Sequence, residues 1–289
     1  MENRHSRFCW PNHANEATVA GGGWSPELPL AQVLSNVFAE VAQSVDTAPT
    51  STQMAVLLRR FRPIGVVALA KHNMSAAARW RVRVYYDDSG ADIAVDSGWR
   101  DVWPAVYATS ELEWEYDNYW SGTLDEDDRG DFTPLATCWL GDSYLARRVT
   151  IEIDDQGNPD GCVRIGRLFL GDVWQPAFNI SYGVQYGFQI GTEFETAGDA
   201  DQTEYADIKT PKRTVNLSLD WLDEEEGFSR ILTMHRRQGL HGEILYAEST
   251  EPGQAAFATT FIGRQVSVDP LAHPYHNTYT NSLSLQEIL

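Results

Sequence analysis

Residues 79–86 read RWRVRVYY, and their alternation of side-chain type is the feature that most constrains the fold. The first set is Trp80, Val82, Val84 and Tyr86, and the second is Arg79, Arg81, Arg83 and Tyr85. A period of two places alternate side chains on opposite faces of a strand, so one face is buried and the other is solvated. The pattern therefore predicts a sheet that covers a core with one of its faces.

Further short strands are expected through the N-terminal part of the chain. They are Met54–Leu58, Ile64–Leu69, Ala146–Ile153 and 162–171. Residues 28–45 are ambiguous, because their apolar spacing fits a helix while their β-branched content and turn signals fit a turn followed by a strand. Short strands separated by turns, with little helix, indicate a β-sandwich or jelly roll. Residues 1–176 are therefore predicted to form a β-sandwich.

The rest of the chain is predicted to contain a linker and a second, smaller module. Residues 177–211 are rich in Gly, Tyr and Asp and weakly periodic, which favours an extended arm or linker. Residues 212–289 are predicted to form a small antiparallel β module with one helix. Its strands are expected at 214–222, 242–248, 255–268 and 277–288. The fold class is thus mainly β.

The helix of this second module is expected after the acidic turn at 223–226 and before Gly239. Helical spacing predicts one buried face, made of Phe228, Ile231, Leu232 and His235. The basic residues His235, Arg236 and Arg237 fall in the last turn, where positive charge is favourable.

Charge and cysteine content exclude several classes of function. The 41 acidic residues outnumber the 22 basic ones, for a net charge of −19, which argues against nucleic acid and anionic membrane as partners. Three scattered cysteines argue against a disulfide framework or a zinc site and for a reducing compartment. Neither a signal peptide nor a membrane span is expected, because no long apolar run occurs. Ten tryptophans and twelve tyrosines favour large buried interfaces or stacking on ligands.

Two acidic stretches suggest cation sites at first sight. Residues 154–161 (DDQGNPDG) are dense in oxygen ligands, but the sequence fails the EF-hand spacing, and a hairpin turn is favoured. Residues 124–132 (LDEDDRGDF) form a second acidic cluster, for which a solvated loop is favoured. No metal site is therefore predicted.

The sequence contains no recognisable constellation of catalytic residues. Glu111, Glu113 and Glu115, near Trp114 and Trp120, are the best candidates for the paired carboxylates of a glycosidase, yet nothing distinguishes them from a polar strand face. The nearby pair of His273 and His276 lacks further metal ligands. The chain is therefore predicted not to be an enzyme and to need no cofactor.

Four separated motifs carry a resemblance to a known group of proteins. They are residues 42–53 (AQSVDTAPTSTQ), 64–87 (IGVVALAKHNMSAAARWRVRVYYD), 96–104 (DSGWRDVWP) and 147–176 (RRVTIEIDDQGNPDGCVRIGRLFLGDVWQP). Together they resemble a tail-associated virion structural protein of double-stranded DNA bacteriophages. The N-terminal part of that group is similar to discoidin-type, galactose-binding-like β-sandwiches. The C-terminal half is loosely similar to distal-tail proteins in its element order and its ending, SLSLQEIL.

This resemblance implies a structural subunit of a phage tail tip or baseplate. It implies a homo-oligomeric ring around the tail axis, with a hexamer favoured over a trimer, and tube, hub, tape-measure or fibre proteins as partners. The location would be the virion tail, after synthesis in the host cytoplasm without a signal peptide. The expected contact between copies is the edge of the sparsely charged strand at 255–268.

The resemblance also suggests a role for the turn at 72–75 (HNMS), which would let the chain cross between the two sheets of the sandwich. Asn73 and Ser75 can bond neighbouring backbone groups, and His72 can donate to a carbonyl across the loop. The turn is thus interpreted as a hinge. Gly166 is expected inside a strand, at a bulge, a positive φ or a close backbone approach. Arg164 and Arg167 are expected to pair with Glu152 and Asp154.

A second function remains open beside the tail role. A sandwich rich in aromatic residues can be a carbohydrate-binding module that engages host surface glycans. Trp99, Trp103 and Trp120 are the candidate glycan contacts, because indole rings stack on the apolar faces of sugars. The alternative at each of the three positions is a tryptophan packed in the core. The two functions are compatible, since a ring subunit can carry a binding sandwich.

Overall fold

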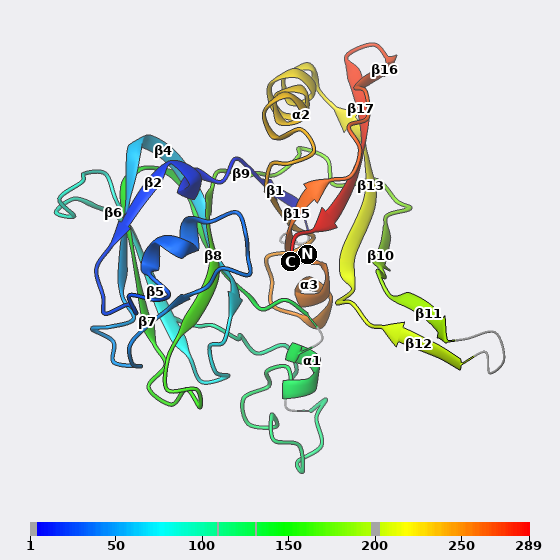
Figure 1. The fold of residues 1–289 in the computed structure, drawn as a ribbon. Coiled ribbons are helices and arrows are strands. Elements are labelled where there is room, and N and C mark those ends of the chain that lie inside the picture. The colour runs from blue at the N-terminus through cyan, green and yellow to red at the C-terminus, as the bar shows by residue number, and fades with distance from the viewer. Residues whose placement is uncertain (1–4, 109, 131, 198–202) are drawn as a thin grey trace. The chain divides into compact units, whose positions relative to one another are not determined.

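A computed structural model of the chain describes residues 5–108, 110–130, 132–197 and 203–289 (Figure 1). The chain is mainly β with antiparallel sheets, as predicted. It divides into two compact units, of which the first is Met1–Pro176 with Glu243–Ile262 and the second is Ala177–Gly242 with Gly263–Leu289. No helix within the described residues has the length and apolarity to span a membrane.

The first unit is built around a seven-stranded antiparallel sheet in the order β3-β8-β4-β7-β5-β6, with β2 also paired to β4. Its strands are β2 (Ala17–Ala20), β3 (Ala42–Gln43), β4 (Met54–His72), β5 (Arg79–Tyr85), β6 (Ile93–Asp101), β7 (Leu135–Asp154) and β8 (Arg164–Gly171). Two 3₁₀ helices, η1 (His13–Glu16) and η2 (Leu30–Leu34), lie in the N-terminal part. The ambiguous stretch 28–45 thus forms η2, a turn and β3.

The sheet folds into a sandwich because β4 and β7 each run through both layers. The first part of β4 pairs with β2 and with the end of β7, which also pairs with β5. After a register shift between Leu57 and Arg62, the second part of β4 pairs with β8 and with the start of β7. The predicted strands Met54–Leu58 and Ile64–Leu69 are therefore two halves of one bent strand.

Apolar residues of the two layers meet in one core. The buried residues include Val56, Leu69, Trp80, Val82, Val84, Val149, Ile151, Ile153, Leu168 and Leu170. The alternation predicted in β5 and β7 is confirmed by these side chains, with one change at the end of β5. There Tyr85 is buried although it lies on the outer face with Arg83, where its hydroxyl is 3.5 Å from Thr150 Oγ1, and Tyr86 is exposed because it lies beyond the last paired residue.

Residues 243–262, which the sequence analysis assigned to the second module, belong to the first unit. They contain β14 (Ile244–Ala247) and α3 (Gln254–Thr259). β14 pairs with β1 (Arg7–Cys9), which in turn pairs with β9 (Val173–Trp174). The strand expected at 255–268 is wrong in its first part, which is the helix α3. The remainder is β15 (Phe261–Gln265), an interior strand with a neighbour on each side. The expected ring contact through a free edge there is therefore wrong as well.

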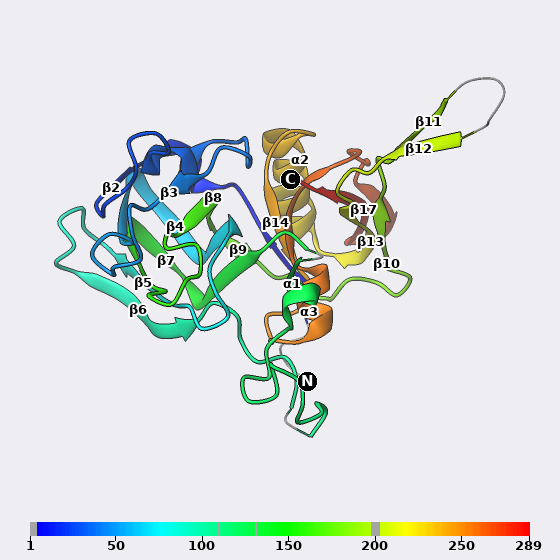
Figure 2. The same ribbon diagram turned by 60° about the horizontal axis from the view of Figure 1, so that its bottom comes forward.

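The second unit contains a sheet in the order β10-β13-β17-β15, with β16 also paired to β17. Its remaining strands are β10 (Gln185–Gln189), β11 (Glu193–Ala197), β12 (Thr203–Asp207), β13 (Lys212–Leu222), β16 (Ala272–Tyr275) and β17 (Thr278–Glu287). Residues 177–211 are thus not a plain linker. β10 pairs with β13, and β11 pairs with β12, so the segment is one side of a long hairpin and its outer end (Figure 2).

The helix of the second unit begins with a π-helical segment, η3 (Glu226–Leu232), and continues as α2 (Thr233–Gln238), with Gly239 at its end. The predicted apolar face is only partly correct. Ile231 and His235 are buried, whereas Phe228 and Leu232 are exposed. The reason is the wider π turn, whose i→i+5 bonding changes the phase of the side chains from that of a regular α-helix.

Candidate functional site

The turn at 72–75 joins β4 to β5 and so leads from one layer of the sandwich to the other. The loop at 155–163 joins β7 to β8 and crosses between the same layers, so it is not the expected hairpin turn. Side chains tie the two crossings together. Asn73 Nδ2 donates to Asp160 at 2.8 Å, and the Ser75 backbone N–H donates to Asp155 at 3.0 Å. Asn73 and Ser75 therefore bond a distant loop rather than only their neighbours in the sequence.

His72 accepts a hydrogen bond where donation to a carbonyl was expected. Its Nδ1 accepts from the Met74 backbone N–H at 3.3 Å, which places the imidazole proton on the buried Nε2. Burial lowers the pKa of His72 from 6.5 to about 3. The ring packs edge-on against Trp103, with ring centroids 5.4 Å apart. His72 is thus a neutral core residue.

This burial predicts a pH dependence of stability. Between pH 6.5 and about pH 3 the unfolded chain protonates His72 and the folded chain does not, so stability falls as pH falls through that window. A plot of the free energy of unfolding against pH has a slope to which His72 contributes. We expect His72→Gln to reduce that slope near pH 5 by about 1 kcal/mol per pH unit. Urea titrations at several pH values measure this slope. His273→Gln, at an exposed histidine, is the control, and equal slopes in the wild-type protein and His72→Gln would contradict the assignment.

Trp103 is not a ligand contact, so this part of the predicted glycan site is wrong. The side chain is 7% exposed, and its indole N–H donates to the Met74 carbonyl oxygen at 3.0 Å. Phe257 of α3 packs on the same ring at 5.8 Å between centroids, and the Arg129 guanidinium lies 5.5 Å from its centroid. Trp103 therefore anchors the start of the following loop in the core.

The chain after Trp103 forms a loop with a defined base. The backbone N–H groups of Val106 and Tyr107 both donate to the Gly122 carbonyl oxygen, at 2.8 and 2.9 Å. The Gly122 N–H donates to the Asn118 carbonyl oxygen at 2.7 Å. Gly122 has φ +63°, and a Cβ atom there would lie 2.6 Å from the Tyr107 carbonyl oxygen. Only glycine fits this position. We name residues 106–122 the aromatic loop; residue 109 lies outside the described residues.

Large aromatic side chains project from the aromatic loop into solvent. Trp120 is 90% exposed, Trp114 76% and Tyr116 56%. The Trp120 ring meets Tyr119 edge to face, with 5.1 Å between centroids, so Trp120 has a neighbour that limits its orientation. Neither Trp114 nor Tyr116 was among the candidate glycan contacts predicted from the sequence. The signal for them was the run WEYDNYW at 114–120, in which four of seven residues are aromatic.

Carboxylates accompany the aromatic rings. Glu111, Glu113, Glu115 and Asp117 are all exposed on the aromatic loop. Glu111 Oε2 accepts from the Ala108 backbone N–H at 3.1 Å, so part of its function is to hold the loop. The acidic segment at 124–132 contains the short helix α1 (Glu126–Gly130), none of whose residues is buried. Among the described residues, no group of His, Cys, Asp and Glu side chains is arranged to hold a metal ion.

The helix α3 and α1 lie side by side in both views of the fold (Figures 1 and 2). Phe257 of α3 contacts Phe132, which follows α1, with ring centroids 5.3 Å apart and nearly perpendicular. Because Phe257 also packs on Trp103, α3 supports both ends of the segment that contains the aromatic loop. The base of this loop thus depends on residues far along the chain.

Trp99, the remaining predicted glycan contact, lies on β6 and is 39% exposed. It is the register partner of Arg81 on β5, so the two side chains share the outer face of the sheet. Trp99 therefore belongs to a sheet face, whereas Trp120 belongs to the aromatic loop. The structure does not place the predicted tryptophans in one site.

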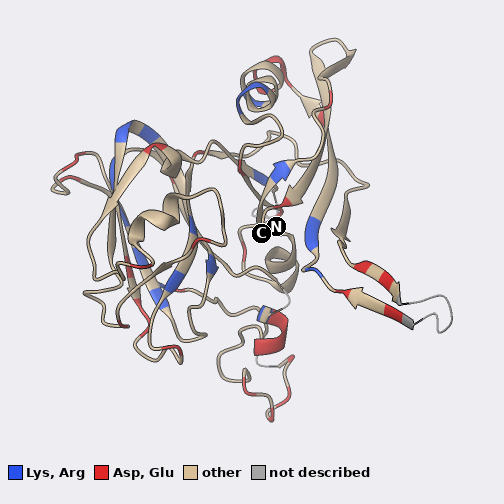
Figure 3. Ribbon diagram, viewed as in Figure 1, with Lys and Arg blue, Asp and Glu red and all other residues tan. Residues whose placement is uncertain are grey.

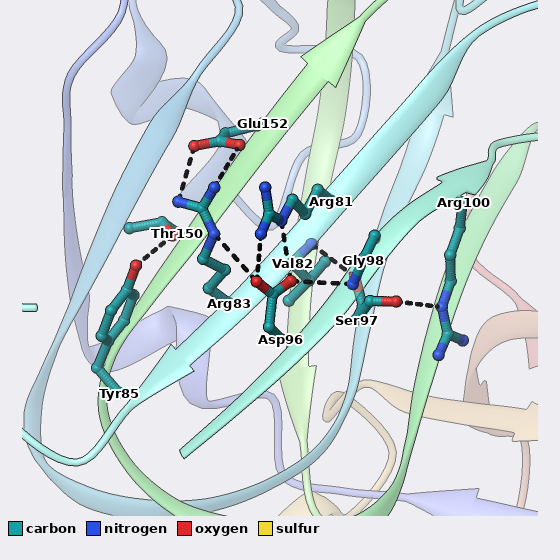
Figure 4. Close-up of polar contacts among 10 residues, drawn as sticks. All are labelled: Arg81, Val82, Arg83, Tyr85, Asp96, Ser97, Gly98, Arg100, Thr150 and Glu152. Carbon is teal, nitrogen blue, oxygen red and sulfur yellow. Dashed lines mark hydrogen bonds and ion pairs between the residues drawn. The ribbon is translucent and has the colours of Figure 1, made fainter. Parts of the chain in front are cut away.

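The sheet face beside Trp99 carries an ion-pair network (Figure 4). Arg83 donates twice to Glu152 at 3.0 Å and lies 3.5 Å from Asp96, to which Arg81 Nε donates at 2.9 Å. The hydrogen bond from Arg81 lowers the pKa of Asp96 to about 2, with the Gly98 backbone N–H contributing in the same direction. Glu152 thus pairs with Arg83 rather than with the predicted Arg164 or Arg167. The arginine and carboxylate side chains of this face are therefore paired with one another.

Comparisons with known proteins add a structural similarity. No family model and no curated protein matches the chain. A family 32 carbohydrate-binding module from Clostridium perfringens NanJ, in complex with galactose, is 11% identical with a TM-score of 0.37, and the match covers 58% of this chain and 99% of that one. A lectin binding domain of Lectinolysin, complexed with Lewis b, is 10% identical with a TM-score of 0.38, over 56% of this chain and 96% of that one. At these TM-scores the matches carry no argument about what this chain binds.

None of the matched proteins named here is a phage tail protein. A third match, CBM32-1 from a family 31 glycoside hydrolase of Clostridium perfringens, is 10% identical with a TM-score of 0.35, over 56% of this chain and 97% of that one. The tail association that the sequence motifs imply, with its ring and its tail partners, stays a prediction.

Proposed function

We propose that the first unit is a carbohydrate-binding module and that the aromatic loop is its ligand surface. The observation that carries this proposal is the exposure of Trp114, Tyr116 and Trp120 on a loop whose base is held by backbone hydrogen bonds at Gly122. Several large apolar side chains that remain in water on one short loop indicate a binding surface. A loop that is already closed loses little conformational entropy when a ligand binds.

The chemistry of the aromatic loop suits sugars. An indole or phenol ring offers a flat apolar face that can cover the C–H face of a pyranose. The exposed carboxylates nearby accept hydrogen bonds from sugar hydroxyl groups. Stacking and hydroxyl recognition can therefore act together on one ligand. The proposed role is binding without catalysis, which agrees with the prediction that the chain is not an enzyme.

The sheet face beside Trp99 is a weaker candidate for the same function. Trp99 is only 39% exposed, and the carboxylates of Asp96 and Glu152 are already paired with arginines. A sugar would have to compete with these ion pairs for hydrogen bonds. The aromatic loop offers more exposed aromatic surface, so we assign the ligand to it.

Replacing Trp120 with alanine is expected to weaken glycan binding about tenfold, because one lost aromatic stacking contact corresponds to about 1.4 kcal/mol. A glycan array first identifies a ligand of the wild-type chain, and isothermal titration calorimetry then compares the variants. Trp221→Ala is the matched control, since Trp221 is also an exposed tryptophan but lies on β13 of the second unit.

Two results would contradict the proposal. One is the absence of any glycan ligand for the folded wild-type chain on the array. The other is a glycan ligand whose affinity is equal in the wild-type protein, Trp120→Ala and Trp221→Ala. In the second case Trp99→Ala shows whether the sheet face holds the ligand instead. Melting curves confirm that each variant is folded, which is expected because Trp120 and Trp221 are surface residues.

A further inference from the structure

The outer end of the long hairpin in the second unit has no core of its own. β11 and β12 pair only with each other in the strand order, and both strands are exposed on both faces where their side chains are described. Phe194 on β11 and Tyr205 on β12 are each more than half exposed. A two-stranded ribbon with two solvated faces is marginally stable in water. The outer end of the hairpin therefore has the properties of a segment that binds another surface.

Charge indicates what kind of surface that is. Glu193, Glu195, Glu204 and Asp207 lie on the described part of the ribbon, and Figure 3 shows this concentration of acidic residues on β11 and β12. Glu195 is the register partner of Tyr205, so a carboxylate and an aromatic ring share one face. Lys209, beyond the ribbon, pairs with Glu193. A complementary surface would combine positive charge with exposed apolar side chains.

The chain carries such a surface itself, at the bend of β4. Residues 59–62 read RRFR, and they lie where the pairing of β4 shifts register between the two layers of the sandwich. Phe61 is more than half exposed, and so is Leu145, the register partner of Pro63. We name Arg59, Arg60, Phe61, Arg62 and Leu145 the basic corner. Figure 3 shows its basic residues at the bend of β4.

The basic corner retains positive charge after its own ion pairs are counted. Glu16 lies 2.5 Å from Arg62 and 3.9 Å from Arg60, so one carboxylate serves two arginines. The Arg60 side chain is 67% exposed, and Arg59 is exposed as well. In a chain of net charge −19, a cluster of three arginines in four residues is a specific feature. It offers guanidinium groups to carboxylates and to aromatic rings.

We infer that two copies of this chain associate, with the acidic hairpin of one copy, made of β11 (Glu193–Ala197) and β12 (Thr203–Asp207), bound to the basic corner of the other. The two surfaces carry opposite charges, and both have exposed apolar side chains that such a contact would bury. Because the two surfaces differ, the contact is heterologous, and each copy can donate one hairpin and accept another. The inference is independent of the proposed glycan function, since it uses none of the residues of the aromatic loop.

Sedimentation velocity of the full chain tests this inference. The average mass is expected to rise as concentration increases from micromolar to hundreds of micromolar. Association is expected to weaken when ionic strength rises from about 0.05 M to about 0.5 M, because salt screens exposed charges. A monomer at every concentration in low salt would overturn the inference. So would association that is unchanged by salt and by the substitutions described next.

Charge reversal provides the decisive comparison. Arg59→Glu with Arg60→Glu, and separately Glu195→Lys with Glu204→Lys, are each expected to weaken self-association at least about tenfold. An equimolar mixture of the two double variants is expected to associate again, because each hairpin then meets a corner of opposite charge. Failure of the mixture to associate, when each variant alone is folded and monomeric, would overturn the inference.

A matched control separates this contact from general charge effects. Arg236→Glu with Arg237→Glu makes the same change of charge at two exposed arginines of α2 in the second unit. This variant is expected to associate as the wild-type chain does. If it loses association to the same degree as the basic-corner variant, the specific contact is wrong. Circular dichroism melting curves establish folding for every variant.

Discussion

Replacing Glu243 with alanine is expected to lower the free energy of unfolding of the first unit by about 3–5 kcal/mol, the cost of leaving one buried charge without its partner. Arg167 is 0% exposed, and its guanidinium donates to both carboxylate oxygens of Glu243 at 2.9 Å. Asn12 Nδ2 donates to the same carboxylate at 2.6 Å. The alanine variant would keep the buried guanidinium and remove its counter-charge.

Urea unfolding followed by circular dichroism measures this loss. Glu16→Ala is the matched control, because Glu16 also pairs with an arginine but is half exposed, and such pairs contribute at most about 1 kcal/mol. If the two variants lose the same stability, the Arg167–Glu243 pair is not an essential buried contact. Replacing both residues, as in Arg167→Met with Glu243→Leu, is expected to cost less than Glu243→Ala alone, since no unpaired charge then remains.

The Arg167–Glu243 pair also determines whether a fragment of the first unit can be stable on its own. Glu243 and β14 lie in the segment that returns to the first unit after the hairpin of the second unit. A fragment that ends at Pro176 would keep Arg167 without Glu243 and β1 without its partner β14. Residues 1–176 alone, which match the predicted boundaries of the sandwich, are therefore expected to be much less stable than the complete chain.

Replacing Gly166 with valine is expected to destabilise the first unit by about 3 kcal/mol, at the upper end of the usual range for overpacking. A Cβ atom at Gly166 would lie 2.7 Å from the Phe38 carbonyl oxygen and 3.0 Å from the Lys71 Cβ. The backbone oxygen cannot move aside as the end of a flexible side chain could. Of the three predicted reasons for a glycine, the close approach is thus the one that the structure contains.

The other two reasons are absent at this position. The φ angle of Gly166 is not in the left-handed range, and the register between β8 and β4 is the same before and after Gly166, so there is no bulge. Leu168 is buried because both faces of β8 are covered. Gly157→Val is the control for the valine substitution, since a Cβ atom at Gly157 meets nothing within 4 Å. Equal melting temperatures for the two variants would contradict the close approach.

The local alternation of apolar and polar residues was sufficient to predict which side chains of the core strands are buried. Trp80, Val82 and Val84 are buried as their alternation predicts, and so are Val149 and Ile151. Such a pattern is readable because a strand places successive side chains on opposite faces whatever its partners are. The mainly β fold class follows from the same local signals.

Local sequence patterns were insufficient to predict which aromatic residues are exposed at the candidate site. Trp103 and Trp120 are both tryptophans in turn-rich sequence, yet one is 7% exposed and the other 90%. What separates them is Phe257, which packs on Trp103 from a helix that the sequence analysis expected to be a strand of the other module. The exposure of a side chain depends on the neighbours that the fold supplies, and these neighbours are far apart in the sequence.

The sequence by itself therefore determined the mainly β fold class and the apolar faces of the strands around the core, since both depend on residues only a few positions apart. It did not determine the type of every element, because α3 forms where a strand was expected. Tertiary structure decided which aromatic side chains face solvent and which charges are paired. Arg164 and Arg167 were expected to pair with the strand of Glu152, but Arg167 instead pairs with Glu243, 76 residues further along the chain. A buried charge is stable only beside its counter-charge, and only the folded chain brings the two together.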